Sequence, residues 1–436
     1  MKQLFVFLVI FWMVKLPLLS SELIGYLRQY PEVVEIKALT PNNIFRESIQ
    51  VSLKQLLDHK NPERGTFLQR IFISVKHTTD PVVMVTEGYA AAYGANPAYL
   101  NELCLILNAN QVVVEHRYFG ESCPDSLDWS FLTVENAAND HHKVVELLKP
   151  FLQGTWINTG ISKGGQTALL HRVFFPADVD ITVSYVAPFN FSVEDGRHEP
   201  YIKKAVGTSS QRKRVREFQK EVLRRRANLM PMFEDLIREK KFTFNASLDV
   251  IFDFCVLEYS FAFWQWGASP AQIPDRRASD EEVFEHFSKI SSPDYFSKEG
   301  LERIGAFFVQ AARELGYYGY DTRPFKNHLV VKNARNYLEW LFLPPGYKVG
   351  FDDTSVKKTR HFMETSDARM IFIYGANDPW TASGAEPPKK ENFIKIVQQG
   401  ASHNIRIAGL DPGNKEIVTG TLRNWLDIPD IKPSQN

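Results

Sequence analysis

The sequence predicts an α/β protein in which a mostly parallel β-sheet is covered by helices and interrupted by a long helical insertion. Between residues 82 and 186, runs rich in β-branched and aromatic residues alternate with helical stretches, an order typical of parallel strands joined by crossover helices. From about Tyr201 to Tyr347 the pattern is almost entirely helical or irregular, and strand patterns resume at Met370. We therefore expect one α/β domain with an insertion, and not two consecutive domains.

Eight segments have the composition and length of strands, and turn residues bound most of them. The first two flank the turn-rich stretch Asp58–Gly65, so we expect them to form a hairpin. The expected strands are Ser48–Leu53, Leu68–Val75, Val82–Thr86, Gln111–Glu115, Thr155–Asn158, Ile181–Val186, Met370–Tyr374 and Phe393–Val397.

Three helices are expected between these strands. One covers Pro97–Asn108. A second begins after Thr133, a suitable N-cap, and its apolar positions keep the helical period as far as Phe151. A third covers Gly164–Phe175 and ends before a proline.

The N-terminus has the layout of a secretory signal peptide, in which a lysine precedes an apolar run from Leu4 to Val14 and small residues follow. This run is too short to cross a bilayer comfortably and Lys15 interrupts it; an uncleaved anchor is the alternative. No later stretch is long and apolar enough for a transmembrane helix. We expect an exported protein without stable membrane insertion once the signal is removed.

These observations predict a division of the chain into four segments. Residues 1–21 form the signal peptide. Residues 22–190 and 356–436 form the two parts of the α/β domain, and residues 191–355 form a helical cap inserted between them.

Composition narrows the class of function. Lys+Arg and Asp+Glu both number 51, so the formal charge is zero, which argues against nucleic-acid binding. Cys104, Cys123 and Cys255 lack metal-ligand spacing, and no H-E-x-x-H motif occurs. The sequence therefore indicates no metal and no cofactor, and it leaves one disulfide possible.

The segment Gly160–Gly164, with the sequence G-I-S-K-G, directly follows an expected strand and directly precedes an expected helix. This is the setting of a nucleophile elbow, in which the serine hydroxyl is presented on a tight turn. We expect Ser162 to be a nucleophile and the Lys163 N–H to be one donor of an oxyanion hole. The alternative is a glycine-rich strand–helix turn with an incidental serine.

A nucleophilic serine needs a base, and the base needs an orienting group. Asp378 follows the expected strand Met370–Tyr374, and His403 follows Phe393–Val397. The order Ser, Asp, His is that of this architecture. Taken singly, Asp378 could cap a turn and His403 could lie in a surface loop, but the shared placement after strands favours a triad.

The second oxyanion donor should come from the loop after Val82–Thr86. That loop contains Gly88 and Tyr89, whose N–H groups are the candidates. His116 lies at the same edge of the sheet, but it precedes Ser162 in sequence, so we expect a structural or substrate-lining role for it.

Several motifs together resemble the secreted bacterial prolyl tri/tetrapeptidyl aminopeptidases, which are similar to lysosomal prolyl carboxypeptidase and the dipeptidyl peptidases. The resemblance implies an α/β-hydrolase domain with a helical cap and release of short N-terminal peptides, often after proline. With the expected signal peptide, we expect a secreted or periplasmic bacterial protein. The resemblance places the catalytic residues on Ser162, Asp378 and His403. The motifs are T-G-I-S-K-G-G, E-H-R-Y-F-G-E-S, L-D-H-K-N-P with T-F-L-Q-R, N-D-P-W and G-A-S-H.

An aminopeptidase must bind the free α-ammonium of its peptide substrate, and carboxylates do this by charge pairing. The candidates are Glu194, Asp195 and Glu258, although each could instead be a solvated or helix-capping acid. Asp321 is a further candidate, with a polar turn as its alternative.

An aromatic run covers Tyr259–Trp266 and includes Phe263, Trp264 and Trp266. Flat rings pack well on a pyrrolidine ring, so this run could form the wall of a proline pocket. The alternative is that these rings form the core of the cap.

The first hypothesis is therefore a serine aminopeptidase that releases tripeptides or tetrapeptides. A prolyl carboxypeptidase or an esterase on the same scaffold is the second, and a carboxypeptidase could use Arg197 or Arg323 to hold a carboxylate. A catalytically inactive binding protein on a hydrolase scaffold is the third.

Overall fold

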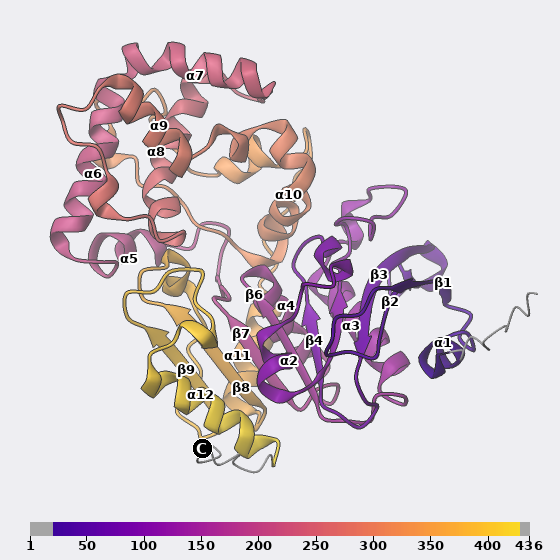
Figure 1. Cartoon of the computed structure of the whole chain (residues 1–436). Helices are drawn as coiled ribbons and strands as arrows, with labels where there is room; N and C mark the ends of the chain where they lie inside the picture. Colours follow the sequence, from indigo (N-terminus) through magenta and orange to yellow (C-terminus); the bar gives the residue numbers. More distant parts are fainter. Residues whose placement is uncertain (1–20, 428–436) are drawn as a thin grey trace, which may run out of the picture.

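The computed structural model describes residues 21–427, which form a nine-stranded sheet in the order β1-β2-β3-β5-β4-β6-β7-β8-β9 (Figure 1). The pairs β1–β2, β2–β3 and β3–β5 are antiparallel. The remaining pairs, β5–β4, β4–β6, β6–β7, β7–β8 and β8–β9, are parallel. The strands are β1 (Val33–Leu39), β2 (Glu47–Leu56), β3 (Thr66–Val75), β4 (Val82–Thr86), β5 (Asn110–Val114), β6 (Trp156–Ile161), β7 (Ile181–Tyr185), β8 (Arg369–Gly375) and β9 (Phe393–Gln398).

All eight expected strands are present, and the first two form the predicted hairpin, in which Leu56 pairs with Thr66. The additional strand is β1, at the edge of the sheet, where its residues are exposed or half-buried. Its sequence, VVEIKAL, carries charged residues at two inner positions. Such residues are tolerated because an edge strand has solvent on one side.

Helices cover both faces of the sheet. On one face α2 (Glu102–Leu107) and α12 (Pro412–Trp425) share a core with the strand residues Val83 and Val85. On the other face α3 (Val134–Leu148), α4 (Lys163–Phe174) and α11 (Thr354–Thr365) pack on the alternate strand residues. Because successive side chains of a strand point to opposite faces, the nearly continuous apolar strands serve both cores.

All three expected helices are present, and they differ from prediction at their ends. α4 begins and ends one residue earlier than the expected Gly164–Phe175. α3 begins after Thr133, whose side chain accepts a hydrogen bond from the Asn136 N–H as predicted, but it ends at Leu148. α2 begins at Glu102, after the Asn101 N-cap, and is therefore shorter than the expected helix Pro97–Asn108.

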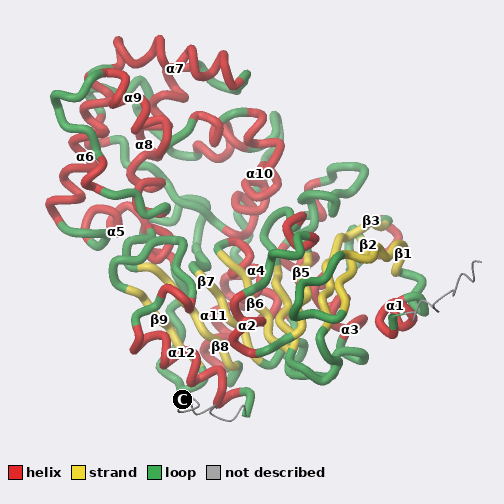
Figure 2. The backbone as a smooth tube through the Cα atoms, viewed as in Figure 1, coloured by secondary structure: helices red, strands yellow, loops and turns green. Residues whose placement is uncertain are grey.

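Between β7 and β8 the described chain forms helices and turns but no strand (Figure 2). Figure 1 shows α5–α10 gathered in a helical body beside one end of the sheet, which we call the helical insertion. The exact residue boundaries of the four predicted segments stay a prediction. The helices of the insertion are α5 (His198–Lys204), α6 (Ser209–Arg224), α7 (Arg226–Lys240), α8 (Leu248–Gln265), α9 (Asp280–Ile290) and α10 (Lys298–Gln310).

Helix α8 runs through the middle of the insertion, and nearly all its residues from Ile251 to Trp264 are buried. A helix that is apolar all round is a core helix. Among residues 21–427 we find no helix with the length and apolarity that a membrane crossing requires. Residues 1–20 of the predicted signal peptide lie outside the described residues, and α1 (Glu22–Leu27) begins directly after Ser21, its N-cap.

The three cysteines are free thiols. Cys104 and Cys255 are buried, and Cys123 is exposed. The structure therefore contains no disulfide among these residues, all of which lie in its described part.

Candidate active site

Ser162 lies on the sharp turn between β6 and α4. Its backbone has φ +56° and ψ −122°, an unusual conformation for a residue with a side chain. The glycines around it are required by close backbone packing, because a Cβ on Gly160 would lie 2.2 Å from the carbonyl of Gly164. This strained strand–helix turn is the geometry of a nucleophile elbow.

His403 and Asp378 form a hydrogen-bonded pair at the ends of neighbouring strands. Nδ1 of His403 donates to Oδ2 of Asp378 at 2.6 Å, and both side chains are buried. The other Asp378 oxygen accepts from the Trp380 N–H at 3.1 Å. Because Nδ1 carries the donated proton, Nε2 is free to act as an acceptor, and it has no hydrogen-bond partner within the described residues.

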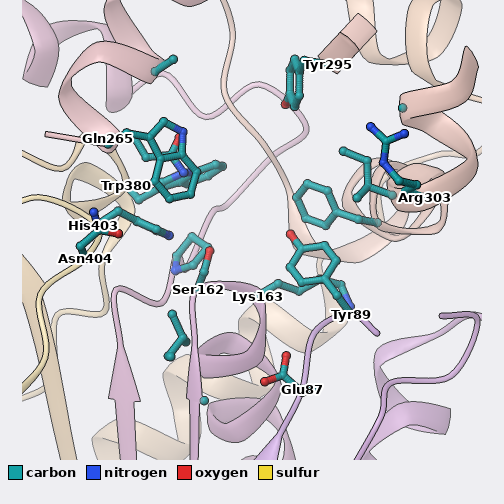
Figure 3. A pocket seen from close by; sticks show the side chains of 18 of the residues that line it. Glu87, Tyr89, Ser162, Lys163, Gln265, Tyr295, Arg303, Trp380, His403 and Asn404 are labelled. Atoms are coloured by element: carbon teal, nitrogen blue, oxygen red, sulfur yellow. The ribbon is translucent and has the colours of Figure 1, made fainter. Parts of the chain in front are cut away.

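Ser162 and His403 line one cavity of about 800 Å³ between the sheet and the helical insertion. In Figure 3, Trp380, Gln265 and His403 lie on one wall of this cavity, and Arg303 lies on the opposite wall. Ser162 and Lys163 lie between these walls (Figure 3). The order and placement predicted from the sequence therefore bring these groups to one cavity, and their catalytic roles stay a prediction.

The helical insertion touches the His403 loop directly. The His403 N–H donates to the carbonyl oxygen of Gln265 at the end of α8, at 3.0 Å. The next residue, Trp266, places its ring 5.7 Å from the His403 ring in an edge-to-face arrangement. The position of His403 thus depends on α8 as well as on the sheet.

The predicted oxyanion residues lie close together. A Cβ on Gly88 would be 2.7 Å from the Gly164 nitrogen, so this loop packs tightly on the elbow. The Gly88 N–H donates to the side chain of Glu87 at 3.3 Å. The N–H groups of Tyr89 and Lys163 engage no acceptor in the described part of the chain. They are therefore the better candidate donors.

The side chain of Lys163 has a role that the sequence did not indicate. Its Nζ donates to the carbonyl oxygen of Gly88 at 2.7 Å, and the side chain is buried beside the rings of Tyr89 and Phe119. Burial lowers the pKa of Lys163 well below its ordinary value. In a trans peptide the C=O and N–H point in opposite directions. Holding the Gly88 oxygen therefore fixes the direction of the Tyr89 N–H.

Two of the six predicted substrate residues, Glu258 and Trp266, line the cavity, and the other four do not. On α8 the positions Glu258, Ala262 and Gln265 face the cavity, because residues at i, i+4 and i+7 share one face of a helix. Phe263 and Trp264 belong to the buried core of the insertion.

The acids Glu194 and Asp195 are engaged elsewhere. Glu194 accepts the N–H of Asn336. Asp195 pairs with Arg197 at 2.7 Å and accepts the N–H of Phe191 at 2.9 Å. Both acids follow β7 closely in sequence, but these contacts hold their side chains away from the cavity.

Glu258 is a buried carboxyl group without a cationic partner in the described chain. Its Oε2 accepts hydrogen bonds from the hydroxyls of Tyr318 and Tyr320, both at 2.8 Å. Burial raises the pKa of Glu258 to about 7. A cation that reached this carboxylate would favour its ionised form.

The other predicted polar residues lie away from the cavity. Arg197 is paired with Asp195, and Arg323 is an exposed residue paired with Asp321 at 2.7 Å. His116 is buried, and its Nδ1 donates to the carbonyl oxygen of Arg117 at 2.7 Å. Neither arginine therefore offers the carboxylate site expected of a carboxypeptidase, and His116 has the structural environment expected for it.

The sheet, the elbow and the order of Ser162, Asp378 and His403 are those of an α/β-hydrolase fold. A profile described as PS-10 peptidase S37 matches residues 32–436. The chain therefore belongs to the S37 peptidase family, and it is a serine peptidase.

Among its relatives is the prolyl tri/tetrapeptidyl aminopeptidase of Streptomyces mobaraensis, which is 30% identical over 390 residues, covering 87% of this chain and 80% of the relative. The lysosomal Pro-X carboxypeptidase of Mus musculus is 22% identical over 80% of this chain and 82% of its own length. A similar solved structure, the proline iminopeptidase of Mycobacterium smegmatis, has a TM-score of 0.42 and 12% identity, covering 87% of this chain and 100% of that one.

Proposed function

We propose that this protein is an exported serine aminopeptidase that releases tripeptides or tetrapeptides from peptides, with a preference for proline near the cleaved bond. The family and the Streptomyces relative support this reaction class. The observation that carries the proposal is the hydrogen bond of 2.6 Å between His403 and Asp378. It leaves Nε2 of His403 free, and His403 lines the same cavity as Ser162. The predicted N-terminal signal is the reason for proposing export.

In the proposed mechanism the Ser162 hydroxyl attacks the scissile carbonyl while Nε2 of His403 takes its proton. Asp378 holds the imidazole in the required tautomer through Nδ1. The N–H groups of Lys163 and Tyr89 stabilise the negative charge on the carbonyl oxygen. His403 then protonates the leaving amine, and water hydrolyses the acyl-enzyme.

Glu258 is the proposed anchor for the substrate ammonium. It lines the cavity, and in the described chain no lysine or arginine pairs with it. An N-terminal ammonium held there and a scissile carbonyl held at Ser162 would fix the number of residues released. Among the six predicted substrate residues, Glu258 is the one acid in the cavity, which favours it over Glu194 and Asp195.

Aromatic residues supply the proposed proline contacts. Trp266 is the one member of the predicted aromatic trio that lines the cavity. The structure adds Phe307, Tyr317 and Trp380 to the same lining. Tyr317 and Trp380 lie 5.4 Å apart between ring centroids, so together they present flat apolar surface on which a pyrrolidine ring can pack.

Replacing Ser162 tests the reaction. We expect Ser162→Ala to lose at least about 10⁴-fold in turnover, because removal of the nucleophile leaves only binding and oxyanion stabilisation. The variant should retain the wild-type thermal transition and lose labelling by a fluorophosphonate probe. Cleavage at the wild-type rate by this variant would refute the assignment.

The end of the peptide that is trimmed tests the substrate class. Wild-type enzyme is incubated with free and N-acetylated proline-containing peptides, and the products are identified by mass spectrometry. We expect tripeptides or tetrapeptides from the N-terminus of the free peptides. Loss of single residues from the C-terminus would instead support a carboxypeptidase, and cleavage confined to esters would support an esterase.

A further inference from the structure

The cavity carries more charge than the proposed reaction uses. Its acidic lining residues are Glu87, Glu258 and Asp294, and its basic lining residues are Lys163, Arg303 and Arg406. Each of these groups is either paired within the protein or available to a substrate, and their hydrogen bonds distinguish the two cases.

Two of the three basic groups are already engaged. Arg303 pairs with Asp294 and donates to the carbonyl oxygen of Glu299 at 2.9 Å. Nζ of Lys163 donates to the carbonyl oxygen of Gly88 at 2.7 Å. Arg303 is therefore neutralised by a carboxylate, and Lys163 is a buried group whose pKa burial lowers well below its ordinary value.

Arg406 is different. Its Nη1 donates to the carbonyl oxygens of His403 and Ile405, at 3.2 and 2.6 Å. Within residues 21–427 neither Nε nor Nη2 makes a hydrogen bond, and Arg406 forms no ion pair. The side chain is half-buried, and three of its five N–H donors are unused.

A nearby carboxylate, Glu102, acts to raise the pKa of Arg406 but offsets the effect of burial only in part. Glu102 accepts the backbone N–H groups of Ile407 and Ala408, at 2.9 and 3.1 Å, and makes no ion pair with Arg406. Burial lowers the pKa of Arg406, so the protein by itself does not fully compensate for the lost hydration of the guanidinium. A carboxylate arriving in the cavity would supply this compensation.

The place of Arg406 in the chain indicates which part of the substrate it meets. In acyl transfer the histidine that accepts the serine proton later delivers it to the leaving amine. The leaving part of the peptide must therefore pass beside His403. Arg406 is on the same loop and contacts the His403 carbonyl, whereas Glu258 belongs to α8 in the helical insertion.

We propose that Arg406 is a carboxylate subsite on the leaving-group side, and that the substrates are short peptides bound by a carboxylate at Arg406 as well as by their ammonium at Glu258. This inference rests on the proposed function. A guanidinium presents parallel N–H donors that match the two oxygens of a carboxylate. The carboxylate is the peptide C-terminus or an acidic side chain in the leaving part.

Three forms of one pentapeptide test the proposal: Ala-Ala-Pro-Ala-Ala as the free acid, the same peptide as the C-terminal amide, and an amide that ends in aspartate. For wild-type enzyme we expect kcat/KM to be about 10-fold or more higher for the free acid than for the alanine amide, the typical effect of a charge-assisted hydrogen bond. If the aspartate amide regains the high kcat/KM of the free acid, a side-chain carboxylate is sufficient for binding at Arg406. If it does not, the carboxylate that binds there is the peptide C-terminus.

Two arginine variants provide the matched comparison. In Arg406→Gln the ratio of kcat/KM between acid and amide should fall to about 1, whatever the absolute rates. In Arg303→Gln, which alters the engaged arginine of the same cavity, the ratio should stay at its wild-type value. A ratio unchanged in Arg406→Gln would overturn the proposal.

Binding to Ser162→Ala, measured by calorimetry, tests the subsite without turnover and without altering Arg406. The free acid should bind about 10-fold more tightly than the amide. Equal affinities would overturn the subsite even if Arg406→Gln does not fold. The proposed function fails separately: it is refuted if Ser162→Ala keeps wild-type turnover, whereas equal treatment of acid and amide by an otherwise active enzyme refutes only the subsite.

Discussion

Two buried carboxylates, one in the α/β domain and one in the helical insertion, have opposite surroundings. Asp140 on α3 binds the guanidinium of Arg117 through both oxygens, at 2.6 and 2.8 Å, and also contacts His59 at 2.8 Å. Within residues 21–427, Glu258 on α8 accepts hydrogen bonds only from the hydroxyls of Tyr318 and Tyr320.

The pKa values of the two groups follow from these contacts. Burial acts to raise the pKa of Asp140, but Arg117 and His59 more than reverse this effect and hold the pKa below its ordinary value. Burial raises the pKa of Glu258 to about 7, and no cation in the described part of the chain opposes this effect. Asp140 belongs to a completed internal pair between α3 and the segment after β5, and His59 from the β2–β3 hairpin contacts it as well. Glu258 lines a cavity, where a substrate cation can complete the pair.

The largest expected effect is on stability. Asp140→Asn leaves the buried Arg117 without its anion, and we expect a loss of about 3–5 kcal/mol in the free energy of unfolding. Glu258→Gln, the matched change in the insertion, should cost less than about 1 kcal/mol because its neighbours are uncharged hydroxyls. Urea unfolding of both variants measures the difference. Similar losses in the two variants would show that the two carboxylates contribute equally to the free energy of unfolding.

The second effect is on substrate binding. Glu258→Gln keeps an acceptor for Tyr318 and Tyr320 but removes the negative charge. We expect kcat/KM for free-amine peptides to fall about 10- to 100-fold, as for loss of a charge-assisted hydrogen bond, and that for N-acetylated peptides or esters to change little. A decrease of the same size for both substrate classes would indicate a structural role.

The third effect is a pH dependence. The carboxyl of Glu258 is neutral below its pKa of about 7 and ionised above it. The ratio of kcat/KM between free-amine and N-acetylated peptides should therefore rise as the pH increases through 7. It should fall again above about pH 8, where the substrate α-amine loses its proton. Ionisations that affect both substrates equally cancel in this ratio. A ratio independent of pH in the wild-type enzyme would contradict the role of Glu258.

The smallest effect should come from Trp266. Its side chain is 57% exposed and touches the His403 ring only edge to face. Trp266→Ala should change the free energy of unfolding by no more than about 0.5 kcal/mol, as for most surface substitutions, and KM for proline peptides by a few-fold. A loss of kcat with unchanged KM would show that Trp266 instead positions His403.

Much of the α/β domain could be predicted from local pattern. Most of the eight expected strands are largely buried and rich in apolar residues, so composition and turn residues sufficed to find them. The additional strand β1 lies at the edge with polar residues, and this pattern resembles a loop. α3 ends earlier and α2 begins later than predicted. The ends of these helices depend on capping hydrogen bonds, which cannot be read from the spacing of apolar residues.

The cavity walls were much less predictable. Of the acids proposed to bind the substrate, Glu258 lies in the cavity, while Glu194 and Asp195 are engaged by neighbouring groups. Arg406 had no sequence signal beyond its position after His403. Whether a charged side chain is paired depends on residues that are distant in the chain, as Arg117 and Asp140 are.

The sequence by itself determined the class of fold, the strand–turn–helix around Ser162, and the order in which Ser162, Asp378 and His403 follow their strands. These features are local: they depend on glycines, on apolar runs and on the rule that parallel strands end at one edge of a sheet. The tertiary structure decided which charges remain uncompensated. That property results from burial and pairing across the whole fold, and it distinguishes Glu258 and Arg406 in the cavity from the paired charges elsewhere.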